Sequence, residues 1–353
     1  MKSKVLVISV SNKGKGGVAT VVTTFMHNAL LNTEYDIHYL HSHNPSGKFN
    51  KYFSLLFVSI YFPFLLLFKR FNVAHIHGSL KGSFVRKSYF LFWLRLFSIP
   101  TIYQCHAAQA ESFFKSLNST QKKYVTNTFK KYQLCLCLGT NWVKKLEHLT
   151  GRNWDILFNP VPEIKLTKVE HKTCNFTFMG ELSERKGIKD LIHAFAKSEN
   201  ENARLLVAGN GDVNSLAALC NELDITDKVE FLGWINKDQK LDLLARTDVV
   251  VLPSYAEGLP MSILEAMSVG LPVITTPVGA VEDAITHNEH GLLVQPGNIE
   301  QIAAALSELA QNTDKRIQLG EKSKLKFLEC FKDDVVAKTL SNYYQQLIAK
   351  AEK

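Results

Sequence analysis

The chain has 353 residues, 46% of them hydrophobic and 21% charged, a composition that excludes a disordered, collagen-like or coiled-coil chain and, at this length, predicts two domains. The charge divides unevenly, with 21 Lys and Arg against 6 Asp and Glu in residues 1–165 and 20 against 27 in the remainder. A basic first half that also holds 16 of the 22 Phe indicates an anionic or membrane-associated partner, unless the lysines only keep the surface soluble.

The chain opens on an apolar strand, residues 5–9, which is not followed by the cleavage site of a secretory signal. The loop from Gly14 to Ala19 then fits the dinucleotide pattern G-x-G-x-x-A. The second strand, residues 36–40, ends without the acidic residue that would bind a ribose, so NAD is disfavoured. The amides of Gly16 and Gly17 remain able to approach an anion at a helix N-terminus, or the loop is only a tight turn.

The longest apolar run covers residues 53–68. Its sixteen residues are fewer than the roughly 20 that a membrane-spanning helix needs, and Pro63 interrupts it. We interpret the run as a buried helix beside a parallel sheet, with a segment that dips into a membrane as the alternative. No transmembrane span is predicted.

Apolar strands alternate with longer helical stretches along the chain, the pattern of two βαβ domains with parallel sheets. Strands are predicted at residues 5–9, 36–40, 73–77, 101–105, 134–138 and 155–158, and again at 175–179, 204–208, 229–232, 248–253, 272–276 and 291–294. A polar segment with two prolines, residues 159–172, is the expected linker. Three helices follow at 299–311, 314–331 and 335–349, and the last is expected to pack back across the linker.

The six cysteines lack the spacing of a metal site or a Cys-x-x-Cys motif, so we predict reduced core thiols in the cytosol and no bound metal. A role in nucleic-acid binding is disfavoured, because the positive charges follow no nucleic-acid-binding motif and the second half is acidic.

A loop whose residues are suited to ligand binding follows the strand at residues 248–253. Gly258 lets backbone amides turn toward an anion at the carboxyl end of the strand, and Pro260 is suited to the first turn of the next helix. Glu257 and Glu265, eight positions apart, can accept hydrogen bonds from the paired hydroxyls of a sugar or ribose. Each glutamate by itself is also explained as a solvated or capping carboxylate.

A second loop, residues 180–187, joins a predicted strand to a predicted helix. Arg185 and Lys186 lie at that turn, where two cations can neutralise a diphosphate leaving group as Mg²⁺ does elsewhere. No Asp-x-Asp occurs in the chain. The two observations favour metal-independent chemistry.

Taken together, these segments resemble the retaining nucleotide-sugar glycosyltransferases of family 4. The resemblance spans nearly the whole chain, and its most specific part is the E-x7-E pattern from Glu257 to Glu265. It implies the α/β GT-B fold, in which two Rossmann-like domains face a cleft, with an acceptor-binding domain at 1–165 and a nucleotide-sugar-binding domain with terminal helices at 166–353. Supporting matches are Gly16-Gly17, Arg185-Lys186-Gly187, residues 209–212 and residues 231–233.

The resemblance also implies a role for each site residue. Glu257 would hold the hydroxyls of the donor sugar and Glu265 the ribose. Arg185 and Lys186 would bind the diphosphate together with backbone amides at Gly16, Gly17, Gly258 and Leu259. Trp234 and Ile235 would lie near the base, and His106 near the transferred sugar unless it is structural.

Two segments qualify these roles. Many family members have an Arg that contacts phosphate where Glu181 stands here, which leaves the positive charge to Arg185 and Lys186. Residues 75–97 look like the acceptor-side segment of enzymes that build bacterial surface polysaccharides. Arg86 and Lys87 would meet the phosphates of a polyprenyl-diphosphate-linked sugar while the following aromatic residues lie on the bilayer, or the segment is an amphipathic core helix.

The implied activity is transfer, with retention, of a sugar from a nucleotide-sugar donor to a saccharide acceptor. The donor is expected to be a UDP-sugar and the acceptor to be lipid-linked. The product would be a surface polysaccharide such as O-antigen, capsule or exopolysaccharide. The enzyme would need no cofactor and no metal and would work in the cytoplasm, peripheral on the cytoplasmic face of the inner membrane. The alternatives are a UDP-sugar 2-epimerase-like GT-B enzyme and a non-catalytic nucleotide-binding subunit of a polysaccharide assembly complex.

Overall fold

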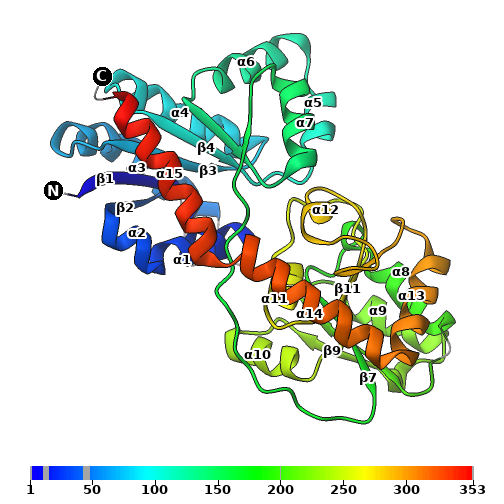
Figure 1. The fold of residues 1–353 in the computed structure, drawn as a ribbon. Helices are drawn as coiled ribbons and strands as arrows, with labels where there is room; N and C mark the ends of the chain where they lie inside the picture. Colours follow the sequence, from blue (N-terminus) through cyan, green and yellow to red (C-terminus); the bar gives the residue numbers. More distant parts are fainter. Residues whose placement is uncertain (1, 11–15, 43–47, 199, 352–353) are drawn as a thin grey trace. The chain divides into compact units, whose positions relative to one another are not determined.

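A computed structural model describes residues 2–10, 16–42, 48–198 and 200–351. The chain divides into two compact units (Figure 1). Unit 1 consists of Met1–Pro160 and Asp333–Lys353, and unit 2 of Val161–Lys332. The chain therefore leaves unit 1 within the expected linker. It returns with its last helix, which the predicted range 166–353 had assigned to the second domain.

Unit 1 is built on a parallel sheet in the order β2-β1-β3-β4-β5-β6. Its strands are β1 (Ser3–Ser9), β2 (Tyr35–His41), β3 (Val73–Gly78), β4 (Thr101–Cys105), β5 (Leu134–Cys137) and β6 (Asp155–Ile156). Each coincides with a predicted strand to within three residues at either end. The inner strands β3 and β4 are buried along their whole length, as expected for a parallel sheet that is covered on both faces.

The helices of unit 1 connect these strands. They are α1 (Gly17–His27), α2 (Ala29–Glu34), α3 (Lys48–Phe68), α4 (Gly82–Leu96), α5 (Ala110–Lys115), α6 (Ser119–Phe129) and α7 (Thr140–Thr150). The last helix of the chain, α15 (Asp333–Ala351), packs on α2, α1 and β3. It does so because Val336, Leu340, Tyr344 and Leu347 recur every three or four residues and are all buried. The expected return of the C-terminal helix is confirmed.

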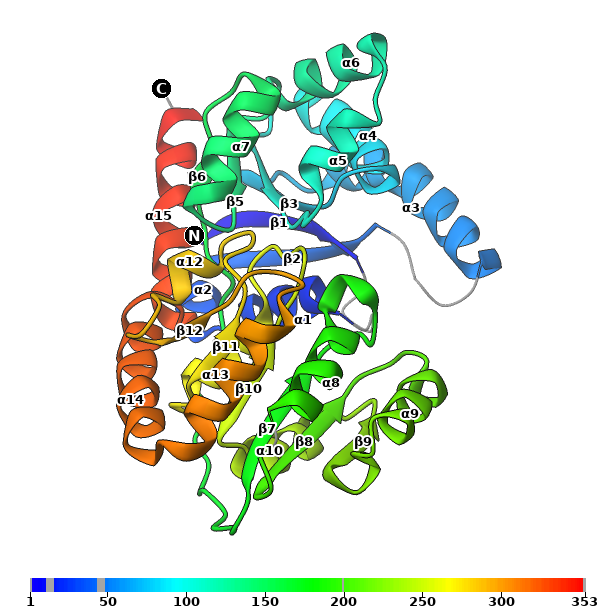
Figure 2. The same cartoon turned by 90° about the vertical axis from the view of Figure 1, so that its right-hand side faces the viewer.

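The helix α3 corrects one expectation. The apolar run at 53–68 forms the second part of this helix, with Pro63 inside it rather than at an end. Phe62 and Leu66 are buried, but the opposite side of the helix carries exposed apolar side chains. The interpretation as a buried helix is thus wrong for one of the two faces, because only one side of α3 meets another element. Figure 2 shows α3 extending beyond the sheet of unit 1.

Unit 2 contains a second parallel sheet, in the order β12-β11-β10-β7-β8-β9. Its strands are β7 (Cys174–Met179), β8 (Ala203–Ala208), β9 (Val229–Gly233), β10 (Val249–Leu252), β11 (Val273–Thr275) and β12 (Gly291–Leu293). Its helices are α8 (Ile188–Lys197), α9 (Val213–Glu222), α10 (Lys237–Ala245), α11 (Met261–Ser268), α12 (Val281–Ala284), α13 (Ile299–Gln311) and α14 (Thr313–Cys330), and 3₁₀ turns lie at Glu184–Lys186 and Thr226–Lys228.

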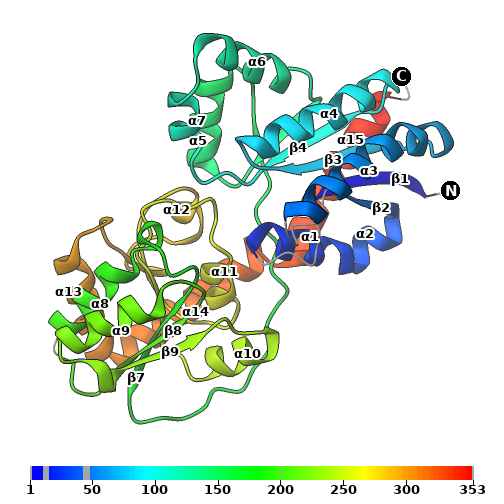
Figure 3. The ribbon, with the colours of Figure 1, turned by 180° about the vertical axis from the view of Figure 1, so that it is seen from behind.

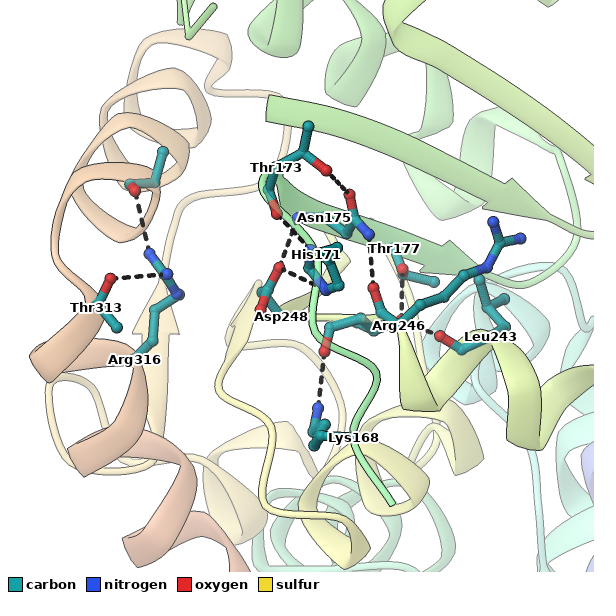
Figure 4. A network of polar contacts seen from close by, with 12 residues as sticks. Lys168, His171, Thr173, Asn175, Thr177, Leu243, Arg246, Asp248, Thr313 and Arg316 are labelled. Atoms are coloured by element: carbon teal, nitrogen blue, oxygen red, sulfur yellow. Dashed lines mark hydrogen bonds and ion pairs between the residues drawn. The ribbon is translucent and has the colours of Figure 1, made fainter. Parts of the chain in front are cut away.

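A polar network joins the amino ends of β7 and β10 (Figure 4). The backbone N–H of Asn175 donates to Asp248 Oδ2 at 2.7 Å, and the Asn175 side chain donates to the Arg246 carbonyl at 2.7 Å. Lys168 Nζ donates to the Thr247 carbonyl at 2.8 Å and so ties the incoming linker to the same end. The register of these two strands is therefore fixed at the end opposite to their following loops.

Two parallel six-stranded sheets with connecting helices confirm the predicted α/β fold of two Rossmann-like domains. All six cysteines are free, five of them buried and Cys330 half-buried. Among the residues that the structure describes, no helix is both long and apolar enough to cross a membrane.

Candidate functional site

The strand order of unit 2 reverses between β7 and β10, since the chain first builds outward through β8 and β9 and then through β11 and β12. In open parallel sheets, ligands bind outside the carboxyl ends of the strands at such a reversal. The loops that follow β7 and β10 are the two loops that carry Arg185, Lys186 and Glu257. The topology thus brings both predicted segments to one edge of one sheet.

The two loops are in direct backbone contact. The N–H of Tyr255 donates to the Arg185 carbonyl at 2.8 Å. Gly187 ends the 3₁₀ turn at Glu184–Lys186 with φ of 70°, and a Cβ there would lie 2.2 Å from the Pro253 carbonyl oxygen. Only glycine fits this close approach in this backbone conformation.

Lys186 and Glu257 form the centre of the site. Lys186 Nζ donates to Glu257 Oε1 at 2.5 Å, and Ser254 Oγ donates to the same oxygen at 2.7 Å. Arg185 Nη1 donates to the Ala256 carbonyl at 2.9 Å and lies 3.8 Å from Glu257 Oε2. Glu257 is only 6% exposed, so this carboxylate is removed from water and held in place by two cations and a hydroxyl.

Glu181, the residue that departs from the family pattern, takes part in the same cluster. Its Oε2 accepts a hydrogen bond from Arg185 Nη2 at 3.2 Å, and its side chain is 64% exposed. Arg185, Lys186, Glu181 and Glu257 together carry no net formal charge. Arg185 Nη2 therefore donates to Glu181, whereas without that carboxylate it could donate to a phosphate.

The loop after β11 packs closely against the backbone of Glu257 and Gly258. Gly279 has φ of 65°, and a Cβ there would lie 2.1 Å from the Glu257 carbonyl oxygen. The N–H of Ala280 donates to the Gly258 carbonyl at 2.8 Å. Gly258 and Leu259 are both buried, Leu259 at 3% exposure, so the predicted donor-binding turn is a fixed part of the core.

Glu265 lies one turn inside α11 and has a partner that the sequence analysis missed. Lys240 Nζ, from α10, donates to Glu265 Oε1 at 2.5 Å. The Glu265 residue is 8% exposed. Nothing in the spacing of Lys240 marks it, because the pairing depends on how α10 packs in unit 2.

Trp234 and Ile235 follow β9 at the same carboxyl edge. The loops after β7, β8 and β9 lie in one row, because the Gly209 N–H donates to the Gly233 carbonyl at 2.8 Å and a Cβ on Gly209 would lie 1.7 Å from the Gly180 carbonyl oxygen. Trp234 is 50% exposed, while Ile235 is half-buried.

In unit 1, Gly16, Gly17 and His106 follow the carboxyl ends of strands. Gly16 is the N-cap of α1 and Gly17 its first residue; Gly14 and Lys15 lie outside the described residues. His106 follows β4, and its N–H donates to the Gly78 carbonyl at 2.9 Å. The structure brings His106 together with two histidines of β3.

His75, His77 and His106 form a row of imidazoles that the sequence analysis did not single out. His77 Nδ1 lies 3.1 Å from His106 Nε2, the His75 and His77 rings stack at 4.2 Å, and His75 Nδ1 lies 2.8 Å from the Tyr344 hydroxyl. Burial lowers the pKa of His106 to about 4 and that of His75 to about 3. The alternating His-Ile-His of the strand was the signal that could have shown His75 and His77 on one face.

Arg86 and Lys87 are neighbours on α4, the helix whose course Figure 3 shows, but they differ in burial. Lys87 is 1% exposed, and its Nζ donates to the Ile8 carbonyl at 3.4 Å. Burial and the neighbouring Arg86 lower the pKa of Lys87 to about 7. Lys87 thus points into unit 1 rather than onto an exposed basic face, because its position on α4 faces the sheet. Arg86 is half-buried.

Comparison with known proteins gives a family match within unit 2. Residues 164–326 match the family model described as "Glycosyl transferases group 1". An uncharacterised glycosyltransferase of Methanocaldococcus jannaschii is 32% identical over 247 residues, which cover 68% of this chain and 63% of that protein. A lipopolysaccharide core biosynthesis glycosyltransferase of Rhizobium meliloti is 31% identical over 172 residues, 48% of each chain. The chain spans less than two thirds of the length of these relatives.

Solved structures resemble the whole chain in fold. Sucrose-phosphate synthase from Thermosynechococcus elongatus gives a TM-score of 0.85 at 17% identity, over 99% of this chain and 100% of that one. Anabaena HepE in complex with UDP-glucose gives 0.76 at 16% identity, over 97% and 99%. The architecture is therefore GT-B, and the sequence match shows that unit 2 belongs to the glycosyl transferases of group 1.

Proposed function

We propose that this protein is a retaining glycosyltransferase that moves a sugar from a UDP-sugar to a lipid-linked saccharide in surface polysaccharide biosynthesis. The observation that carries the proposal is the cluster of Lys186, Arg185 and Glu257 on two touching loops at the strand-order reversal of unit 2. Two cations and an oriented carboxylate at that position suit a donor with both a diphosphate and sugar hydroxyls.

In the proposed reaction, Arg185 and Lys186 bind the diphosphate and Glu257 orients the sugar hydroxyls. The bond from the anomeric carbon to the diphosphate oxygen breaks, and the acceptor hydroxyl forms its new bond to that carbon on the same face. The acceptor proton passes to the departing phosphate oxygen. The protein supplies positioning and charge neutralisation, with no protein nucleophile.

The remaining residues have supporting roles in this proposal. Glu265 binds the ribose and is held for it by Lys240, Trp234 offers an exposed ring to the base, and His106 contacts the transferred sugar as a neutral imidazole. Because Arg185 and Lys186 carry the neutralising charge, we propose that turnover needs no divalent metal.

Relatives support the choice of donor and pathway. HepE was solved with UDP-glucose bound, and the Rhizobium meliloti relative is named for lipopolysaccharide core synthesis. Arg86 remains our proposed contact for the acceptor phosphates, whereas Lys87 is buried and is not part of that contact.

The test is turnover of a panel of UDP-sugars with and without lipid-linked acceptors, in buffer containing EDTA. We expect acceptor-dependent release of UDP and a product with the anomeric configuration of the donor by NMR. Lys186→Ala should lower kcat at least about 100-fold, by analogy with removal of one charge-stabilising donor. Lys189→Ala, an exposed lysine three positions later, is the matched control and should be neutral.

The same experiment separates the alternatives. UDP binding without any turnover would favour a non-catalytic assembly subunit. Conversion of the donor without an acceptor would favour the 2-epimerase-like enzyme. Turnover that EDTA abolishes would contradict the metal-independent part of the proposal.

A further inference from the structure

The proposed function leaves the apolar face of α3 in unit 1 unexplained. This face consists of Leu56, Phe57, Ile60, Tyr61, Phe64, Leu67 and Phe68, whose exposed fractions range from 43% to 86%. At 3.6 residues per turn these seven positions fall within an arc of about 140°. Seven large apolar side chains on one face form a patch of the kind that marks an interaction surface.

The other face of the same helix shows why the apolar face is not part of the core. Phe62 packs edge-on against Phe90 of α4 at 4.9 Å between ring centroids, and the Tyr89 hydroxyl donates to the Ser59 carbonyl at 2.5 Å. These contacts fix the orientation of α3 on α4. The apolar face must therefore point away from α4 and into the solvent.

The charge around α3 decides which partner fits this face. Residues 37–110 contain no Asp or Glu, while Lys48, Lys51, Lys69, Arg70, Lys81, Arg86, Lys87 and Arg95 all lie in that stretch. Lys69 and Arg70 follow directly on the last turn of α3. On the neighbouring α4, Val85, Phe92 and Leu96 form a second stripe at 60% to 64% exposure.

Apolar residues flanked only by cations are suited to an anionic lipid surface. The rings and aliphatic side chains enter the boundary of the acyl chains, and lysine and arginine stay among the headgroups. A protein partner would fit the apolar residues, but lysines are depleted at the centre of protein interfaces. We propose that the apolar face of α3 inserts into the surface of an anionic bilayer and docks unit 1 there without crossing it.

This proposal extends the proposed function, since it names the surface from which a lipid-linked acceptor would reach unit 1. Its test is independent of catalysis. The full chain is floated with vesicles of phosphatidylcholine alone and with vesicles that also contain phosphatidylglycerol, at low and high salt and without nucleotide. We expect flotation only with the anionic vesicles, weakened by salt.

The decisive variant is Phe57→Ser/Phe64→Ser/Phe68→Ser. It should lower the partition coefficient onto anionic vesicles at least tenfold, with the circular dichroism spectrum and melting temperature kept. The matched control is Val169→Ser/Ile317→Ser/Leu325→Ser in unit 2, whose residues are 55%, 53% and 61% exposed. That control should float like the parent.

Equal flotation of the two triple variants would overturn the proposal, as would a parent protein that stays unbound at low salt. Self-association that depends on the three phenylalanines, without flotation, would instead assign the face to a second copy. Transfer to a water-soluble acceptor should survive the α3 substitutions. A protein that floats but transfers nothing would contradict the proposed function and leave the docking surface standing.

Discussion

Lys186 and Glu257 are 71 positions apart and meet at 2.5 Å with little access to water. Burying two opposite charges is costly unless their geometry and hydrogen bonds are good, and removal of one partner leaves the other charge uncompensated. Ser254 and Arg185 supply the additional contacts to Glu257. These contacts hold Lys186 and Glu257 in one arrangement, and a preorganised arrangement reduces the reorganisation needed on donor binding.

Glu181 offers a sharp test of the charge in this site. Its carboxylate pairs with Arg185 but is well exposed, and exposed pairs contribute only about 0.2–1 kcal/mol. Glu181→Gln should therefore raise the affinity for UDP by roughly two- to fivefold, because it frees a donor of Arg185 and removes a negative charge. Isothermal titration calorimetry at two salt concentrations measures the effect.

The matched control for Glu181 is Glu184→Gln. Glu184 is also exposed but pairs with Lys189, at 3.9 Å, outside the cluster. We expect no change in UDP affinity for this variant. Weaker UDP binding by Glu181→Gln would show that Arg185 needs its present partner to stay in position.

At the scale of elements, the 3₁₀ turn after β7 and the loop after β10 depend on one glycine. Gly187→Ala would combine an unfavourable positive φ with a Cβ 2.2 Å from the Pro253 carbonyl oxygen. We expect unit 2 to lose at least about 2 kcal/mol of stability. UDP affinity should fall as well, because the two loops would separate and part Lys186 from Glu257.

Gly233→Ala is the comparison for this prediction. Gly233 has nearly the same φ, 63°, but a Cβ there would meet nothing within 4 Å. Gly233→Ala should lower the free energy of unfolding only through the unfavourable positive φ of the alanine, by about 1 kcal/mol. Urea unfolding of both variants decides the question, and equal losses would mean that the contact with Pro253 relaxes.

At the scale of the whole molecule, the two units should respond differently to acid. The pKa of His106 is lowered to about 4 and that of His75 to about 3, and His77 shifts in the same direction. Burial is the main cause in each case. The unfolded chain therefore binds more protons than unit 1 as the pH falls below about 6.5, and unit 1 loses stability over that range.

Each of the three histidines adds up to about 1.4 kcal/mol of destabilisation per pH unit in this window. Among the described residues of unit 2, His290 is the one histidine whose pKa burial clearly lowers. When the pH falls from 7 to 5, the unfolding temperature of unit 1, measured by calorimetry, should thus decrease more than that of unit 2. His75→Gln should make the stability of unit 1 less dependent on pH. Equal shifts of the two unfolding temperatures would contradict the attribution of this pH dependence to the histidines of unit 1.

The sequence by itself determined the twelve strands, the two-unit α/β fold and the loops that bear Arg185, Lys186 and Glu257. It could do so because strand periodicity, glycine turns and short motifs are local features of the chain. Only the tertiary structure decided that Lys240 holds Glu265, that Lys87 points inward and that Glu181 pairs with Arg185. It also decided that α15 belongs to unit 1 and that one face of α3 stays in the solvent. The physical reason is that burial and pairing depend on which face of an element meets which neighbour, and those contacts join residues far apart in the chain.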